Sequence, residues 1–469
     1  MSYSFSKVIK IVISLALVLF SIIIVVKQMD NPWLWYDEAG QFWISKGLNH
    51  YSAPFAPSMG ISEVIQNNRY YNMDPGGFSI LLHFWLMISN STFFIRLFPL
   101  LFFGGFSYLI YKYLILNTNN KYYSFVCAVM VFLLPTTISR MVEIRAYSME
   151  LMGIVWALYF VAKVQRNNYD IKNLMFLSIG MAIFCTSRFE YVVVAFVVAV
   201  YACIQIIIGR SQVIKKLILF SSPLLLSVLA IIYFTLQYQN PEIERVDYLF
   251  YLCDTPSLFY KYLFLLFALN TVYVLYQYYK KKKLTQLQLL SLLIPSAFVV
   301  LSLLGKYPWD TTRTISVYIV LFVNIANELY ERFNFPVLLK LAVLFILFWG
   351  HHYRIPHGTG LAQYEAFKEV TSNKSSSDIV YVDDWFAPSV RYAYEYGCFK
   401  DRASNNGYPD SFLFQRVLLE KVGKYTKFVF LDLPSQTEAN IYLIGRNYAD
   451  ADRSLSKDSR SLNIYTKRQ

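Results

Sequence analysis

Charged residues are scarce in this sequence: Asp, Glu, Lys and Arg make up 16% of its 469 residues, whereas 56% are hydrophobic. Soluble domains carry roughly 25% charged residues, so this shortage excludes an ordinary soluble protein. Apolar runs such as 8–26 reach the ~20 residues that cross a bilayer as a helix. Because spanning segments must satisfy their own backbone hydrogen bonds, the sequence predicts a polytopic α-helical membrane protein.

Cysteine is also scarce. The five Cys residues, at positions 127, 185, 203, 253 and 398, form no CxxC motif and no metal-ligand spacing, which argues against a disulfide framework. The formal net charge of +13 is not gathered into one basic patch. Basic residues lie between the apolar runs, where they act as topology signals, so we do not expect nucleic-acid binding.

The apolar runs predict about eleven spans, with the N-terminus in the cytoplasm. This count places Lys-rich connections such as 280–283 on the cytoplasmic side, as the positive-inside rule requires. In the first outer loop, 27–92, the short apolar segment 76–88 is interpreted as an interfacial or re-entrant helix. The predicted spans are 8–26, 93–115, 122–138, 149–163, 173–187, 191–208, 217–236, 258–279, 286–304, 313–330 and 337–352.

From about residue 353 the composition becomes polar, which divides the chain into a membrane domain, 1–352, and a soluble outer-face domain, 353–469. Alternating strand and helix patterns predict a small α/β fold for the second domain. The predicted strands are 378–383, 427–432 and 462–466, and the predicted helices are 387–396, 411–422 and 435–446.

The most informative stretch follows the first span, where Asp37 and Glu38 lie among aromatic residues from Trp33 to Trp43. Carboxylates are costly to desolvate, so at a membrane boundary they are either solvated or placed for a task. One interpretation is a solvated acidic pair in an interfacial aromatic belt. The other is a site where a carboxylate takes a proton from an acceptor or binds a metal.

Three further polar segments fall on the predicted outer side of the first spans. Asp74-Pro-Gly-Gly77 is typical of a turn. The segments 140–147 and 187–191 each combine acidic and basic residues. Structural ion pairs explain both segments, but Arg145 and Arg188 also suit a phosphate oxyanion.

A later outer segment, 305–313, carries Lys306 and Arg313 against the usual charge bias of outer loops. A lipid-linked phosphate explains both residues, as does ordinary headgroup contact. His351, His352 and His357 follow the last span, but no carboxylate or Cys completes a metal site there. No metal or other cofactor requirement can be read from the sequence, and a divalent metal on the outer carboxylates stays open.

These motifs, in this order and on one predicted side, resemble the GT-C superfamily of membrane glycosyltransferases. The narrower resemblance is to the bacterial branch related to protein O-mannosyltransferases and the lipid A aminoarabinose transferase. It rests on the acidic pair Asp37-Glu38, the stretch from Asp74 to Pro99, the segment 139–148 and the segment 307–313. It covers residues 1–150 well and the later spans loosely. This chain departs from the family at Gly76, where a second Pro is frequent.

The resemblance implies a GT-C-like fold and transfer of a hexose or pentose from a polyprenyl-phosphate donor to a glycan, lipid or protein acceptor. The resemblance also implies that the reaction inverts the anomeric centre by direct displacement. It places the reaction on the outer face of a bacterial inner membrane and the C-terminal domain in the periplasm. The implied catalytic residues are Asp37 as the base, Glu38 as its support and Glu143. The implied donor-phosphate contacts are Arg145, Arg188, Lys306 and Arg313, and the implied substrate contacts are Tyr36, Asp74 and Tyr147.

Two other classes of protein share the spans and outer arginines. A transporter of lipid-linked sugars is disfavoured because we find no internal repeat and no matching Gly/Pro-broken segments. A polysaccharide polymerase or ligase would not need an Asp-Glu pair in the first outer loop. Substitution of Asp37 and Glu38 therefore discriminates the glycosyltransferase from the polymerase or ligase.

Overall fold

The computed structural model describes two compact units. Unit 1 comprises Met1–Lys27, Asn68–Phe78 and Leu97–Pro356, and unit 2 comprises Gln28–Asn67, Ser79–Arg96 and His357–Gln469. The residues described are 2–49, 52, 55–72, 74–138, 140–209, 211–235, 258–304, 314–349, 367–368, 372, 379–382, 387–400, 412–414, 417–422, 425–430 and 441–444.

Six helices in the described residues are long and apolar enough to cross a membrane. They are α1 (Ser2–Met29), α5 (Thr92–Thr118), α8 (Tyr147–Arg166), α10 (Phe189–Ile208), α11 (Val213–Phe234) and α14 (Gln286–Leu303). Outward-facing residues such as Leu15 and Leu226 are more than half exposed, as expected of side chains that meet lipid. The prediction of an α-helical membrane protein is confirmed, whereas the count of eleven spans stays a prediction.

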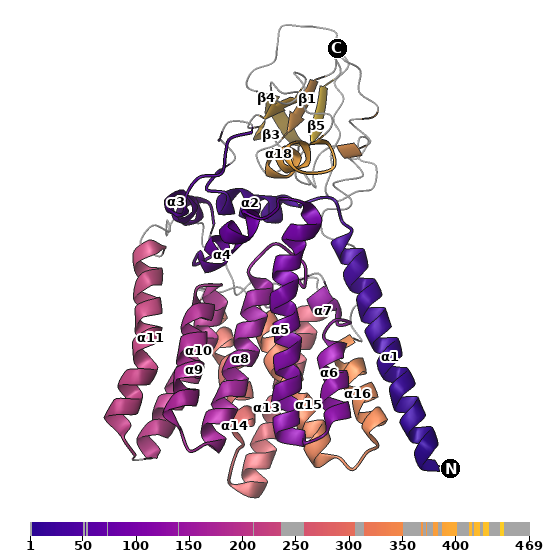
Figure 1. Cartoon of the computed structure of the whole chain (residues 1–469), viewed down its shortest axis with the longest axis vertical. Helices are drawn as coiled ribbons and strands as arrows, with labels where there is room; N and C mark the ends of the chain where they lie inside the picture. The colour runs from indigo at the N-terminus through magenta and orange to yellow at the C-terminus, as the bar shows by residue number, and fades with distance from the viewer. Residues whose placement is uncertain are drawn as a thin grey trace. The chain divides into compact units, whose positions relative to one another are not determined.

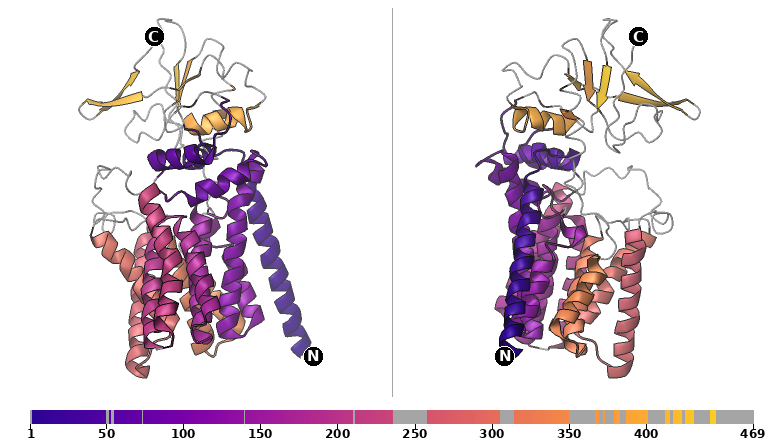
Figure 2. Two further views of the ribbon diagram at one scale, coloured as in Figure 1. Left: turned by 60° about the vertical axis from the view of Figure 1, so that its left-hand side comes forward. Right: turned by 90° about the vertical axis from the view of Figure 1, so that its right-hand side faces the viewer.

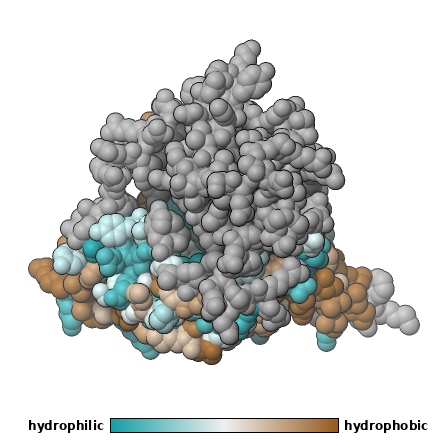
Figure 3. Space-filling view, turned by 90° about the horizontal axis from the view of Figure 1, so that it is seen from above, coloured by the Kyte–Doolittle hydropathy of each residue, from teal (hydrophilic) through white to brown (hydrophobic). Residues whose placement is uncertain are grey.

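Further helices complete the bundle of unit 1. They are α6 (Lys121–Met130), α7 (Pro135–Ile138), α9 (Ile171–Cys185), α13 (Leu258–Lys281), α15 (Ile315–Arg332) and α16 (Val337–Trp349). In Figure 1 α5, α8, α9, α10 and α11 run along one direction, and both views of Figure 2 show the same bundle of long helices. Seen end-on, hydrophobic surface marks the two margins, where α1 and α11 lie in Figure 1 (Figure 3).

Small and polar residues hold these helices together, because the hydrophobic effect does not favour helix–helix contact over contact with apolar lipid. α8 meets α9 at Gly180, where a Cβ would lie 2.0 Å from Nε1 of Trp156, so only glycine allows this approach. Asn324 of α15 donates to Asn270 of α13 at 2.8 Å, and Asn270 donates to Ser291 of α14 at 3.2 Å. These hydrogen bonds join three helices at a buried position.

The predicted span 122–138 is wrong as a continuous helix. α6 ends at Met130, and the short α7 begins only at Pro135. A proline disfavours helical backbone at the residue before it, so the chain turns between the two pieces. The predicted segment 76–88 does form a helix, α4 (Gly77–Leu86), preceded by α3 (Ile61–Tyr71).

Unit 2 is built around the packing of α2 (Tyr36–Ser45) on α18 (Ala387–Glu395). The ring of Phe42 meets that of Tyr392 edge-on with centroids 4.9 Å apart. Trp43 donates through Nε1 to the carbonyl of Pro388 at 3.0 Å, and its ring lies 4.0 Å beneath the Arg391 guanidinium. Residues of the predicted first outer loop and C-terminal region therefore share one core.

The described C-terminal strands are short. β2 (Phe412–Phe414), β1 (Ile379–Val382) and β5 (Ile441–Ile444) form a parallel sheet in that order, and β3 (Val417–Val422) pairs with β4 (Tyr425–Phe430) as an antiparallel hairpin. The predictions of strands at 378–383 and 427–432 and of a helix at 387–396 agree with β1, β4 and α18 within a few residues. The predicted strand 462–466 lies outside the described residues.

Two helix predictions in this region are wrong. Residues 412–414 form β2 and residues 417–422 form β3, which pairs with β4 from Val417 opposite Phe430 to Val422 opposite Tyr425. Within 435–446, residues 441–444 form β5, which gains its stability from pairing with β1. Tertiary pairing outweighs helical periodicity in both places.

Candidate functional site

In unit 1 the Asp74 turn is fixed by contacts to three other segments. Gly76 has φ +96°, a value that favours glycine, and the Asn68 side chain donates to the Asp74 carbonyl at 2.9 Å. The Gly77 amide donates to the carbonyl of Thr186 at 2.9 Å, and Thr235 donates to the Pro75 carbonyl at 3.1 Å. The turn thus presents Asp74 at the ends of α9, α10 and α11.

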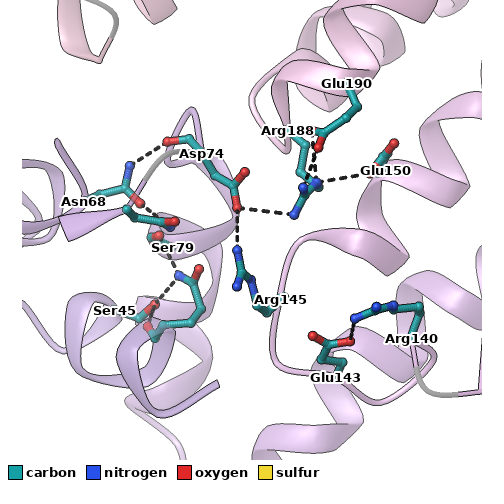
Figure 4. Close-up of polar contacts among 12 residues, drawn as sticks. Ser45, Asn68, Asp74, Ser79, Arg140, Glu143, Arg145, Glu150, Arg188 and Glu190 are labelled. Carbon is teal, nitrogen blue, oxygen red and sulfur yellow. Dashed lines mark hydrogen bonds and ion pairs between the residues drawn. The ribbon is translucent and has the colours of Figure 1, made fainter. Parts of the chain in front are cut away.

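Arg188, directly before α10, lies among three carboxylates (Figure 4). Its Nη2 is 2.5 Å from Oε1 of Glu190, its Nε is 3.2 Å from Oε2 of Glu150, and its Nη1 is 3.7 Å from Oδ2 of Asp74. Burial by itself lowers the pKa of Arg188, but Asp74 and Glu190 raise that pKa well above its ordinary value. Arg188 is therefore a fixed cation that ties α8, α10 and the Asp74 turn together.

Arg145 reaches the same cluster less tightly. Its Nη2 lies 3.8 Å from Oδ2 of Asp74, the oxygen that also faces Arg188. The Arg145 side chain is 18% exposed, whereas that of Arg188 is 5% exposed. Arg145 is thus the more accessible of the two predicted phosphate contacts, and it shares its carboxylate with a second arginine.

Tyr147, at the start of α8, gathers three guanidinium groups around its ring. Arg188 lies 4.2 Å, Arg140 4.3 Å and Arg145 5.7 Å from the ring centroid, within the range of cation–π attraction. Arg140 also donates to Oε2 of Glu143. Oε1 of Glu143 is buried and accepts no hydrogen bond from a described residue, so this carboxylate keeps an acceptor position unused.

Sequence reasoning missed Glu150, which is fully buried in α8. Its Oε1 accepts a hydrogen bond of 2.5 Å from Ser316 of α15, while its Oε2 faces Arg188. The available signal was a single carboxylate one turn into an apolar helix, because an acidic residue inside a span is costly without a partner. Glu190 was noted only as a local ion-pair partner, yet it shares Arg188 with residues distant in sequence.

In unit 2, Glu38 and Asp37 have different environments. Glu38 is buried, and its two oxygens lie 2.7 Å from Nη1 and 3.1 Å from Nη2 of Arg96. Arg96 also donates to the carbonyl of Trp33 at 2.9 Å, and Glu38 accepts the Trp35 amide at 3.3 Å. Glu38 is therefore held in place by Arg96 at the beginning of α2.

Asp37 and Tyr36 occupy the first turn of α2 and are half-buried. A carboxylate in the first turn of a helix is stabilised by the partial positive charge of that helix end. Asp37 thus lies on a fixed helix and keeps partial access to solvent, unlike its buried neighbour Glu38.

Two predicted site residues, Lys306 and Arg313, lie outside the described residues, as do His351, His352 and His357. In the described part of the chain, no group of three or more His, Cys, Asp or Glu side chains is placed to hold a metal ion. Comparison with protein-family models and with curated proteins finds no match to this chain.

Proposed function

We propose that the chain is a membrane glycosyltransferase that moves a sugar from a polyprenyl-phosphate donor to an acceptor on the outer face of a bacterial inner membrane. The observation that carries the proposal is the state of Arg145. It is partly exposed, it lies 3.8 Å from a carboxylate that also faces Arg188, and it lies beside the start of the apolar helix α8. A membrane-held phosphate is the anion that such an arginine suits.

The geometry supports different roles for Arg145 and Arg188 in this proposal. Arg188 is already engaged by Glu150, Glu190 and Asp74, so a phosphate would have to displace three carboxylates from it. Arg145 is the more accessible of the two arginines, and the Asp74 carboxylate that it faces is also paired with Arg188. We assign Arg145 to the leaving phosphate and Arg188 to the positioning of Asp74.

In the proposed reaction the acceptor hydroxyl attacks the anomeric carbon of the donor, and its proton passes to a carboxylate, the role that the resemblance to GT-C glycosyltransferases assigns to Asp37. The new bond joins the acceptor oxygen to that carbon, while the carbon–oxygen bond to phosphate breaks and its electron pair leaves with the polyprenyl phosphate. Attack opposite the leaving group inverts the anomeric centre. Stabilising the charge on the departing phosphate is the task that suits Arg145.

The remaining residues have supporting roles in this proposal. Glu38 holds the first turn of α2 through Arg96. Glu143 offers a buried acceptor oxygen for a substrate hydroxyl, and Tyr147 keeps the arginines in register. Lys306 and Arg313 are proposed as further phosphate contacts, Tyr36 and Asp74 as substrate contacts, and the C-terminal α/β region as a periplasmic domain.

The proposal is tested by transfer from labelled polyprenyl-phosphate sugars, supplied as a panel of hexoses and pentoses, in membranes that contain equal amounts of each variant. We expect Asp37→Asn to abolish transfer and Arg145→Gln to reduce it by about 10²–10³-fold, the typical effect of losing one charge-stabilising group. Asp30→Asn and Arg166→Gln, at exposed positions, are matched controls that keep activity. Undiminished transfer by Asp37→Asn would refute the assignment of the base.

A further inference from the structure

A groove between α5 and α6 has no part in the proposed reaction. It has a volume of about 510 Å³, within the roughly 300–1,000 Å³ range of small-molecule sites. Its lining residues are Gly104, Ser107, Tyr108, Tyr111, Lys121, Tyr122, Phe125, Ala128 and Val129. Ser107 donates to the Ala128 carbonyl at 2.7 Å, which fixes the two helices side by side along the floor (Figure 1).

The walls of the groove are aromatic and its floor is open. Tyr108 is 57% exposed and Phe125 37% exposed, so their rings stand at the surface. A Cβ built on Gly104 meets no atom within 4 Å, so this glycine leaves space that no neighbouring side chain fills. An apolar slot of this kind, along α5, a helix of membrane-spanning length, matches a hydrocarbon chain.

One end of the groove is positively charged. Lys121 lines the groove, the Nζ of Lys112 lies 5.4 Å from the Tyr108 ring, and the Nζ of Lys10 in α1 lies 5.6 Å from the Tyr122 ring. The segments of α1, α5 and α6 contain no Asp or Glu. The buried hydroxyl of Tyr122 has no hydrogen-bond partner among the described residues, so a donor for an anionic oxygen lies beside these ammonium groups.

We propose that this groove binds an anionic glycerophospholipid, with one acyl chain over Gly104 and the headgroup phosphate at Lys112, Lys121 and Lys10. The apolar walls suit the acyl chain of the lipid, and the three ammonium groups favour a headgroup with negative charge. A zwitterionic lipid carries no net charge for these lysines to attract. The site is separate from the Asp74 and Asp37 regions, so it stands whether or not the proposed transferase activity does.

The test is native mass spectrometry of the purified full chain, titrated with phosphatidylglycerol and with phosphatidylcholine of the same acyl chains. We expect one phosphatidylglycerol to bind at least fivefold more tightly than phosphatidylcholine. Gly104→Leu should remove this tight binding of the first phosphatidylglycerol by filling the groove. Lys112→Gln combined with Lys121→Gln should weaken the binding by about 25-fold, or about fivefold for each lysine. Ser222→Leu and Lys215→Gln, at exposed positions of α11, should bind as wild type.

Each variant is first checked for wild-type elution and melting temperature. If Gly104→Leu does not fold, the lysine pair decides the test, because neither of its ammonium groups is placed in the protein core. Equal binding of the two lipids by wild type indicates annular lipid only and overturns the proposal. Tight phosphatidylglycerol binding that persists in Gly104→Leu, or in the variant with both lysine substitutions, overturns the proposal as well.

Discussion

Nε of Arg188 lies 3.2 Å from Oε2 of Glu150, so an arginine just before α10 neutralises a carboxylate inside α8. Both side chains are at most 5% exposed. A buried charge without its partner is far more costly than a broken surface pair. This contact, with the Asp74 and Glu190 contacts of the same guanidinium, makes Arg188 the residue on which the polar cluster depends.

Arg188→Gln should therefore lower stability strongly. It removes the guanidinium group that faces Glu150, Glu190 and Asp74, and removal of one partner from a buried pair costs about 3–5 kcal/mol. The measurement is the melting temperature of the purified protein in detergent. Arg166→Gln, which changes an exposed arginine of α8, should melt as wild type, and an equally small effect of both changes would contradict the central role of Arg188.

Ser316→Ala should destabilise the chain by about 1.5–3 kcal/mol, the usual contribution of a hydrogen bond to a charged group. It removes the donor to Oε1 of Glu150 and leaves that oxygen buried. The same change in a Glu150→Gln background should cost less, because the acceptor is then uncharged. A double-mutant cycle of melting free energies measures this difference, and strict additivity would show that the two side chains do not interact.

The adjacent residues Glu38 and Asp37 should respond in opposite ways. Glu38→Gln weakens a buried two-point pair with Arg96 and should lower the stability of unit 2 by about 3–5 kcal/mol. Asp37→Asn should lower the melting temperature far less than Glu38→Gln does, while it abolishes transfer. Limited proteolysis and the transfer assay, carried out on the same preparations, separate the two effects.

Gly77→Ala should displace the Asp74 turn. A Cβ at this position would lie 2.0 Å from Oγ1 and 2.9 Å from the carbonyl oxygen of Thr186, so the turn must shift. We expect a lower melting temperature and reduced transfer. Gly104→Ala is the matched control: it adds the same methyl group in open space and should stabilise α5 by about 0.5–1 kcal/mol.

Lys46 should make stability depend on alkaline pH. Its pKa is lowered because burial disfavours the charged form, although Glu395 partly opposes this shift and Arg391 adds to it. Between the lowered pKa and the ordinary value of 10.5, the unfolded chain binds more protons than the folded one, so stability rises with pH. Melting curves of wild type and Lys46→Met should converge toward pH 10.5, and a constant difference would exclude this titration.

Features set by local sequence were predictable from the chain alone. The apolar runs reveal the long helices, and helical periodicity reveals α18. The predicted span 122–138 fails because Pro135 divides it into α6 and α7, and the predicted helix 411–422 fails because β3 pairs with β4. Both errors come from treating a segment without its neighbours.

The charged cluster was predictable only as a list of residues. The motifs single out Asp74, Arg145 and Arg188, but the pattern does not show that one guanidinium serves three carboxylates. Glu150 became recognisable only when α8, α10 and α15 were packed together. Pair distances depend on helix rotation, which the periodicity of one helix does not determine.

The Asp74 turn has a consequence for biogenesis. The ribosome completes Asp74 well before it reaches Arg145 and Arg188, the two cations that neutralise this carboxylate. The ion pairs of Asp74 with these two arginines can therefore form only after α8 and the residues before α10 have been synthesised. The completion of this cluster is a late event in synthesis, and a chain truncated after α7 lacks both Arg145 and Arg188.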